Sequence, residues 1–320
     1  MLYSKDTAVT VIRRMVAKDR LCHAFILCGE KGVGKKTLAK YMAAQILCER
    51  GTGIPCGECK SCRMIKNGAH PDFITVTPRG KTGNYLADNL RAVISDSSVA
   101  PNEGQKKIYF LPRIDKALPA AQNVLLKIVE EPPEHVCFIM TAETKEKILP
   151  TVLSRAILLN VPEPSEDECR EALLKAGIPS ESAESAIAVF GGNIGRCLEY
   201  LGDDGAKKLP QTVGEITDCI ISGDEYALLR SLTSLESDRE LCLDVLAALK
   251  SVIRDAIAQK LGGELYSVCR ERAKKLSETV RRSSLRQMYD EITAAEAKIN
   301  GNASALLCLS DLCGRLAVNR

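Results

Sequence analysis

The stretch "LCGEKGVGKKTLAKYMAAQ" (27–45) decides the fold, because it contains a glycine-rich loop between an apolar run and a helical segment. The spacing of a phosphate-binding P-loop is Gly, four residues, Gly, Lys, and then Ser or Thr. Gly29, Gly34 and Lys35 fit this spacing. The stretch therefore predicts a strand, a phosphate-binding turn and a helix, in that order.

The residues around the lysine keep the shape of the loop but weaken its metal chemistry. In a P-loop, backbone N–H groups surround the phosphates, and the hydroxyl after the lysine holds Mg²⁺. Gly32 supports the backbone shape, but Lys36 stands at the hydroxyl position and cannot ligate a cation. Thr37 comes one residue late and faces another direction, because each residue of a helix turns the side chain by about 100°.

A second defect lies in "KIYFLPRIDKA" (107–117), the candidate for the strand that carries an acidic pair. An ATPase would place Asp and Glu directly after the apolar run, but this chain has Pro112 and Arg113, and Asp115 lies beyond the strand end. We therefore predict that the chain does not hydrolyse ATP by itself, and ATP/Mg²⁺ binding without hydrolysis stays open. An active ATPase, in which Thr37 and Asp115 replace the missing metal contacts, stays open as the alternative.

Around the loop, up to about residue 160, short apolar runs alternate with helical segments. Continuous apolar runs fit strands buried on both faces, and the alternation predicts an α/β P-loop domain over 1–162, with a parallel sheet wrapped by helices. The expected strands span 24–28, 72–76, 107–111, 136–140 and 156–161, and the expected helices lie near 35–49, 85–95, 119–131 and 144–153.

The rest of the chain reads as helices only. "VPEPSEDE" (161–168) breaks the earlier pattern, and Ser165 with Glu168 predicts a capping box that opens a helix. Apolar stripes at helical spacing follow in 238–261 and 303–317. We expect a small helical domain over 163–203 and a second helical domain over 204–320, whose stripes pack within a bundle or form an oligomerisation face.

Four of the 14 cysteines lie close together, at Cys48, Cys56, Cys59 and Cys62. Two overlapping Cys-x-x-Cys turns and a fourth cysteine upstream suit tetrahedral Zn²⁺. Because protein would fill all four positions, this zinc knuckle at about 48–62 is expected to be structural. A redox pair and unligated thiols are the alternatives.

Composition excludes several classes of function. Tryptophan is absent and aromatic residues make up 4%, which disfavours binding of nucleic acid by stacking. The net charge of +3 does not indicate an electrostatic grip on DNA by the whole chain. The chain has neither a signal-peptide core nor a membrane-spanning run, so we expect a cytoplasmic protein without membrane contact. The basic loop "PRGKTGN" (78–84) is expected to be a solvated turn.

Taken together, these features resemble bacterial clamp-loader proteins of the AAA+ class, and among them the δ′-type subunits of DNA polymerase III. Essentially the whole chain takes part in the resemblance. Its most specific elements are the cysteine insertion, "HPDF" (70–73), and "NVLLKIVEEPPEHVCFIMTAETKEKILPTVLSRA" (123–156). The catalytic γ-type subunits share much of this, but their loop and acidic pair would be intact.

The resemblance also assigns residues. In the family's ring, an arginine at the place of Arg155, next to Ser154, is offered to ATP bound in the neighbouring subunit, whereas the sequence alone suggests a surface cation just before a strand. Thr141 falls at the first sensor position. The sensor arginine of γ-type subunits would fall at Gly195, and Arg196 is one place off.

The resemblance implies a function and partners. The chain would be a non-catalytic stator in a hetero-pentameric ring with γ/τ ATPase subunits and δ, with domains two and three as lid and collar. The ring would load a sliding clamp onto primer-template DNA. A γ/τ-like ATPase, an ATP-binding regulator, and a zinc-knuckle binder of nucleic acid outside any ring are the rival interpretations.

Overall fold

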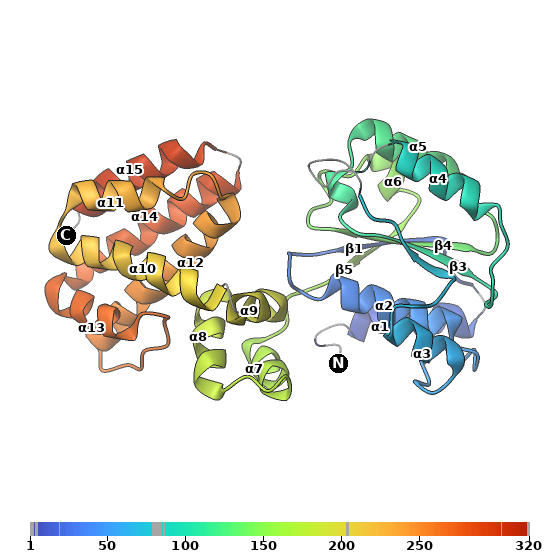
Figure 1. The fold of residues 1–320 in the computed structure, drawn as a ribbon, viewed down its shortest axis with the longest axis horizontal. Coiled ribbons are helices and arrows are strands. Elements are labelled where there is room, and N and C mark those ends of the chain that lie inside the picture. The colour runs from blue at the N-terminus through green and yellow to red at the C-terminus, as the bar shows by residue number, and fades with distance from the viewer. Residues whose placement is uncertain are drawn as a thin grey trace. The chain divides into compact units, whose positions relative to one another are not determined.

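The structure of the chain is a computed structural model that describes residues 3, 6–18, 20–78, 85, 87–202, 205–301 and 303–318. It divides into two compact units, Met1–Pro164 and Ser165–Arg320, drawn in Figure 1. The predicted basic loop 78–84 lies, apart from residue 78, outside the described residues. None of the helices in the described ranges is long and apolar enough to cross a membrane.

The first unit contains the predicted parallel sheet. All strand pairs are parallel, in the order β2-β3-β4-β1-β5. Ile26 of β1 lies opposite Met140 on one side and Leu158 on the other, so β1 is an interior strand. The strands are β1 (Ala24–Cys28), β2 (Phe73–Thr75), β3 (Lys107–Leu111), β4 (Val136–Ala142) and β5 (Ile157–Asn160).

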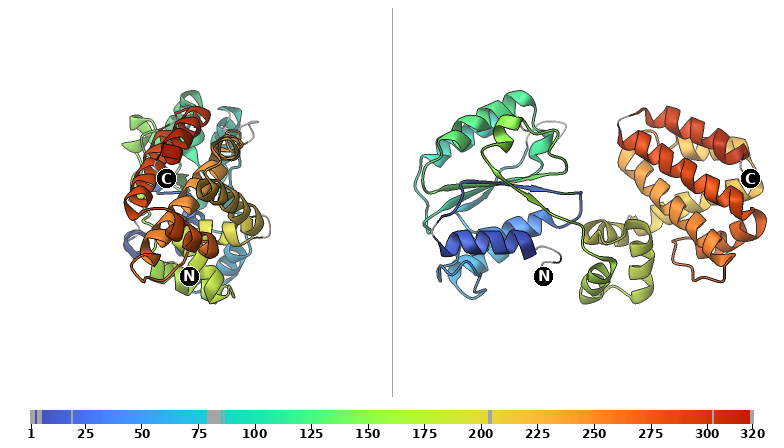
Figure 2. Two further views of the ribbon diagram at one scale, coloured as in Figure 1. Left: turned by 90° about the vertical axis from the view of Figure 1, so that its left-hand side faces the viewer. Right: turned by 180° about the vertical axis from the view of Figure 1, so that it is seen from behind.

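Helices cover both faces of this sheet, as Figure 1 and the view from behind in Figure 2 show. Alternate residues of β1 enter two cores: Phe25 and Leu27 enter one, and Ala24 and Ile26 enter the other. On one face lie α1 (Asp6–Ala17), α2 (Lys35–Leu47) and α3 (Lys60–Lys66). On the other lie α4 (Ala87–Ser97), α5 (Pro119–Glu130) and α6 (Pro150–Leu153), and a 3₁₀ turn, η1 (Ile114–Lys116), follows β3.

One predicted helix is much shorter than expected. The sequence pattern placed a helix near 144–153, but α6 begins only at Pro150, after turns at 145–148. Proline fits the first position of a helix, but it disfavours helical conformation in the residue before it, here Leu149. The helix therefore starts at the proline and does not run through it.

The second unit is helical, as predicted. The capping box is present: the Ser165 hydroxyl accepts from the Glu168 N–H, and the Glu168 carboxylate accepts from the Ser165 N–H. One buried apolar cluster extends from Cys169 to Leu316. The helices are α7 (Glu166–Lys175), α8 (Ser180–Phe190), α9 (Ile194–Leu201), α10 (Gly205–Ser222), α11 (Glu225–Thr233), α12 (Arg239–Gln259), α13 (Arg270–Thr279), α14 (Arg282–Asn300) and α15 (Ala305–Val318).

The observed unit boundary follows Pro164. The further boundary expected at about residue 203 falls at residues 203 and 204, which are outside the described ranges. The division of the chain into three domains therefore stays a prediction.

Candidate functional site

The glycine-rich loop joins β1 to α2, where the sequence predicted it. Gly32 and Gly34 have φ angles of 88° and 91°, in the left-handed region that glycine adopts without a steric penalty. Gly29 needs to be glycine for another reason: a Cβ there would lie 2.4 Å from the carbonyl oxygen of Val161. The backbone of a P-loop is therefore retained.

The two residues after the loop lysine are exposed on the first turn of α2. Lys36 offers an ammonium group where a P-loop needs a hydroxyl, and the hydroxyl of Thr37 belongs to the next helical position. The local geometry gives no replacement for the metal-holding hydroxyl at residue 36.

Arg113 stands directly after β3 and is the centre of an ion-pair cluster. Its guanidinium pairs with Glu143 Oε1 at 2.6 Å and with Asp115 Oδ1 at 3.4 Å. Its φ of 59° is left-handed, and its backbone N–H donates to Thr141 Oγ1 at 2.9 Å. We call Arg113, Asp115 and Glu143 the Arg113 cluster. Asp115 is buried, so its carboxylate is already engaged in this cluster.

The loop lysine turns back onto its own loop. The buried Lys35 amine donates to the carbonyl oxygens of Gly29 and Glu30, at 2.5 and 2.7 Å. Burial lowers the pKa of Lys35, and the charges of the Arg113 cluster act on the same amine. The phosphate loop and the Arg113 cluster are therefore neighbours, and three of their four charges come from residues that sequence reasoning had singled out. Glu143 was missed.

Arg155 and Ser154 follow the last turn of α6. The Arg155 guanidinium donates to the carbonyl oxygen of Thr151 at 3.0 Å and to Ser154 Oγ at 3.2 Å, and it pairs with Glu130 at 3.0 Å. Its side chain is 39% exposed. This arginine is an accessible cation held by an exposed acidic partner.

Arg196 has a structural environment within the second unit. It forms an ion pair with Asp244 of α12, and its guanidinium carbon lies 4.7 Å from the centroid of the Phe190 ring. Both contacts fix α9 within its own unit.

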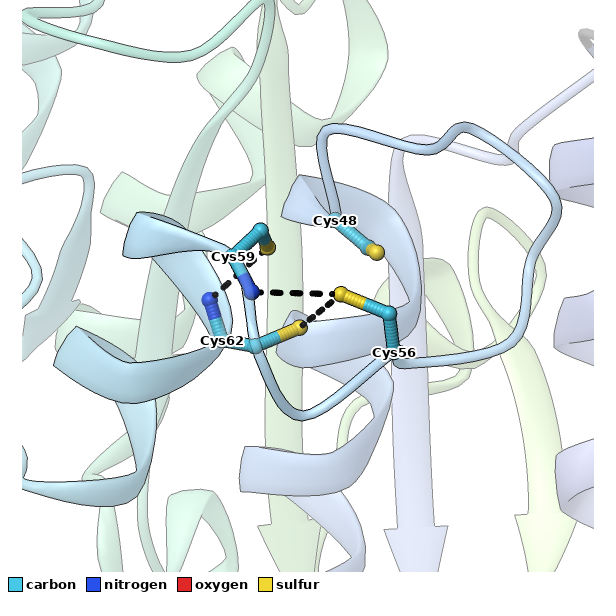
Figure 3. Close-up of side chains that lie close together, drawn as sticks. All are labelled: Cys48, Cys56, Cys59 and Cys62. Carbon is cyan, nitrogen blue, oxygen red and sulfur yellow. Dashed lines mark hydrogen bonds between the residues drawn. The ribbon is translucent and has the colours of Figure 1, made fainter.

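Four thiols gather at the start of α3, as Figure 3 shows. The sulfur atoms of Cys48, Cys56, Cys59 and Cys62 all lie within 4.8 Å of one another. Cys48 caps the C-terminal end of α2, and Cys59 caps the N-terminal end of α3, where its sulfur accepts from the Cys62 N–H at 3.4 Å. The insertion thus brings together the four residues that the spacing predicted.

The geometry of this cluster fits a tetrahedral thiolate site. Four zinc–sulfur bonds of about 2.3 Å put the sulfur atoms about 3.8 Å apart, and the Sγ atoms of Cys56 and Cys62 are 4.0 Å apart. Backbone N–H groups of Cys59 and Glu58 lower the pKa of Cys56 to about 6, whereas burial raises the pKa of Cys62 to about 12. The surroundings thus favour the thiolate form of Cys56, whereas burial disfavours the thiolate form of Cys62.

Asp72 anchors the segment after the cysteines, a role the sequence reasoning missed. Its buried carboxylate accepts from the N–H groups of Asn102, Glu103 and Gly104, at 2.6, 2.8 and 2.9 Å. His70 Nδ1 accepts from the Asp72 N–H at 3.1 Å, and its carbonyl accepts from Phe73. The "HPDF" segment therefore fixes the start of β2 and also fastens the loop before β3.

The chain is similar to subunits of DNA polymerase III. The family described as "DNA polymerase III, delta subunit" matches residues 4–165. The delta' subunit of DNA polymerase III from Pseudomonas aeruginosa is 32% identical over 174 residues, 53% of this chain and 53% of that protein. The delta' subunit from Bacillus subtilis is 24% identical over 290 residues, 88% of this chain and 86% of that protein.

Two further matches are to gamma- and tau-type proteins. The tau subunit of DNA polymerase III from Escherichia coli is 32% identical over 154 residues, 48% of this chain and 24% of that protein. The chain thus spans about half the length of the Pseudomonas relative and a quarter of the Escherichia one. Among solved structures, a DNA polymerase III gamma subunit-related protein from Thermotoga maritima is similar to this chain. The match covers 98% of this chain and 99% of the solved chain, at 15% identity and a TM-score of 0.42.

A parallel sheet with a P-loop after β1, followed by a helical unit, defines an α/β P-loop protein. The family match extends over half of the residues. The chain therefore belongs to the DNA polymerase III delta subunit family.

Proposed function

We propose that the chain is a non-hydrolysing, δ′-type subunit of the DNA polymerase III clamp loader. The observation that carries this proposal is the Arg113 cluster. A cation stands directly after β3, where hydrolysis needs carboxylates to hold Mg²⁺ and orient water. The nearest candidate, Asp115, is buried and paired with that cation.

The same cluster weighs against the rival γ/τ-like ATPase. To ligate Mg²⁺, Asp115 would have to leave Arg113, and the arginine would then be a cation beside the metal. Lys36 adds a second cation at the position of the missing hydroxyl. These two cations therefore disfavour Mg²⁺, whereas the retained loop and Lys35 still suit the phosphates of a nucleotide.

Calorimetric titration of the isolated protein with ATP, with and without Mg²⁺, tests this proposal together with an assay for released phosphate. We expect either no binding or binding that is indifferent to Mg²⁺, and no phosphate release. Mg²⁺-dependent binding with turnover that is lost in Lys35→Ala would contradict it and establish an active ATPase.

Arg155 is proposed to act in trans, on ATP held by a neighbouring γ/τ-type subunit, with Ser154 beside it. An arginine finger stabilises the charge that develops on the transferred phosphoryl group, and it is worth about 10³–10⁵ in rate in other phosphoryl-transfer enzymes. Its present partner, Glu130, is 46% exposed. Exposed ion pairs contribute only about 0–1 kcal/mol, so the arginine can leave this pair at low cost.

Zinc is the proposed cofactor of the four-cysteine cluster. Cys48, Cys56, Cys59 and Cys62 would supply all four ligands, which leaves no open position for a substrate. A bound zinc ion would supply a structural cross-link and no reaction step. It would connect the end of α2 to the start of α3.

The proposed partners are γ/τ-type ATPase subunits and δ in a hetero-pentameric ring, with the sliding clamp and primer-template DNA reached through the complex. Support comes from relatives that are named subunits of DNA polymerase III. Residues 163–203 are proposed as a lid, and residues 204–320 are proposed as the collar through which the ring assembles.

A further inference from the structure

A group of cations lies close together in the sequence where α13 gives way to α14. Five of the residues between 274 and 286 are basic and exposed: Lys274, Lys275, Arg281, Arg282 and Arg286. We call these five residues the α13–α14 patch. Glu278 is the single acidic residue from 272 to 289. The net charge of +3 for the whole chain therefore conceals a local concentration of positive charge.

The patch differs from several other cations of this unit, which have acidic partners. Arg272 pairs with Asp218, Lys250 pairs with Glu296, and Arg315 pairs with Asp311 and Glu291. Within the described part of the chain, none of the five patch residues has an ion-pair partner. Their charges thus remain available to a partner molecule.

Stability of the fold does not account for the cations at the start of α14. The N-terminal end of a helix carries partial positive charge, so basic residues there are unfavourable. Yet Arg281 is the N-cap of α14 and makes no side-chain capping bond, Arg282 is its first residue, and the first turn has no acidic residue. Lys274 and Lys275 lie in the middle of α13, outside its last turn. Arg282 and Arg286 are four residues apart and share one face of α14.

The chemistry of the patch favours nucleic acid over a protein partner. Protein interfaces are organised around buried apolar or aromatic anchors. In the described segment 270–288 no large apolar side chain is exposed; the nearest in sequence are Tyr266 and Tyr289. A phosphodiester backbone needs no such anchor, because cations and hydroxyls hold it. Ser283 adds an exposed hydroxyl on the first turn of α14.

We infer that the α13–α14 patch binds the phosphate backbone of nucleic acid, without reading its sequence. The inference concerns the surface of the second unit alone. It stands whether or not the chain is a clamp-loader subunit and whether or not the P-loop binds a nucleotide.

Fluorescence anisotropy of the full-length protein with a fluorescein-labelled DNA duplex, and with a labelled single strand of equal length, tests this inference. Binding is expected to weaken as NaCl rises from about 50 to 200 mM. In a plot of log affinity against log salt, Arg281→Gln/Arg282→Gln/Arg286→Gln should lower the magnitude of the duplex slope by about three, about one for each lost phosphate contact. A greater effect on one probe would identify the strand form that is bound.

The matched control removes the same charge from exposed cations that are already paired: Arg91→Gln/Lys298→Gln/Arg315→Gln. We expect this variant to keep the slope of the unchanged protein. Equal losses in both variants would mean that only net charge matters, and would overturn the inference. If the patch variant does not fold, Arg282→Gln alone should still lower the slope by about one.

Competition identifies the class of partner. The inference expects unlabelled duplex to displace the probe at a lower charge concentration than polyglutamate or vesicles of phosphatidylserine. Displacement by polyglutamate at the same charge concentration would indicate an acidic protein surface as the partner. Preferential displacement by the vesicles would indicate a membrane surface. Either result would overturn the assignment to nucleic acid.

Discussion

Arg113 adopts a left-handed backbone conformation, which costs L-residues roughly 1–2 kcal/mol. Its guanidinium also forms an ion pair with the buried carboxylate of Asp115. The turn after β3 therefore combines a backbone cost with an electrostatic role. Neither feature is needed to end a strand. Together they place a cation, fixed at both its backbone and its side chain, directly after β3.

Two substitutions separate these contributions. Arg113→Ala and Arg113→Gly both remove the guanidinium and leave Asp115 without its partner, so both should be destabilised. Glycine also relieves the left-handed strain, and after its greater unfolded-state entropy is counted we expect Arg113→Gly to be the more stable by about 0.5–1 kcal/mol. Urea unfolding monitored by circular dichroism gives the comparison. An alanine variant as stable as the glycine variant would mean that the turn relaxes when the arginine is lost.

Asp72 links stability to pH. Although burial opposes ionisation, the N–H groups of Asn102, Glu103 and Gly104 hold the pKa of Asp72 below its ordinary value. Because the folded pKa is the lower one, the carboxylate stabilises the fold above about pH 4. This stabilisation is lost as the pH falls from there through the folded pKa.

Asp72→Asn should therefore cost about 1–3 kcal/mol at neutral pH, since the amide cannot accept from every donor around it. The difference from the unchanged protein should shrink below about pH 4. Asp88→Asn is the control: Asp88 is 86% exposed and its pair with Arg91 contributes little. Urea midpoints measured across this pH range give the result, and a constant difference at every pH would refute the linkage.

At the residue scale, the sequence predicted which residues occupy the candidate site, but it predicted only some of the contacts that they make. Spacing identified the loop glycines, Lys35 and the four cysteines, because their chemistry depends on local order along the chain. The pairing of Arg113 with Glu143 joins residues 30 positions apart on neighbouring strand ends. The role of Asp72 likewise depends on a loop 30 residues downstream. No local pattern carries either contact.

Helix α3 has seven residues and depends on the cysteine cluster for its start, since Cys59 is its N-cap. A helix this short is not stable in isolation. The proposed zinc ion would fasten this first turn to the end of α2. The element is therefore expected to be ordered by metal and weakened without it.

We expect about one zinc per chain, because four thiolates make one closed site. Metal analysis of tag-free protein should find it, Cys56→Ser should lower both the zinc content and the thermal midpoint, and Cys219→Ser should change neither. Cys219 is half-buried and lies in α10, outside the cluster. Protein that contains no zinc, with a midpoint unaffected by chelators and by Cys56→Ser, would remove the metal from the proposal.

Element types were predictable where a single period dominates a segment. The strands follow from apolar runs that face helices on both sides of the sheet, and α12 and α15 follow from their stripes. The pattern failed at 144–153, because apolar spacing does not register the restriction that Pro150 imposes on Leu149. Proline outweighed periodicity there.

At the scale of the whole molecule, each compact unit has its own buried core, and the proposed activities are distributed accordingly. The first unit contains the P-loop, the cysteine cluster and Arg155, and the second contains the α13–α14 patch. A variant in one unit should therefore leave the fold of the other intact. The proposed action of Arg155 on a neighbouring subunit can therefore be tested with a variant that leaves the stability of this chain unchanged.

Arg155→Ala should leave thermal unfolding of the isolated protein unchanged, because its contacts are exposed. In a clamp loader reconstituted with γ/τ-type and δ subunits, the same variant should lower DNA-stimulated ATPase activity. It would remove the cation that is proposed to stabilise the transition state on the neighbouring subunit. Arg91→Ala, another exposed and paired arginine, is the matched control. Unchanged turnover in the Arg155→Ala complex would refute the role in trans.

The contact between Gly29 and Val161 bears on how such a chain evolves. A side chain at residue 29 would collide with the backbone of Val161, and the Lys35 amine is used by carbonyl groups of its own loop. A lineage that lost ATP hydrolysis would still keep Gly29, since the fold leaves no room for a side chain there, and Lys35 would keep its contacts with the loop. Motif residues in such a descendant would then reflect its ancestry and the needs of its fold. A P-loop sequence motif can therefore remain after the reaction for which it arose has been lost.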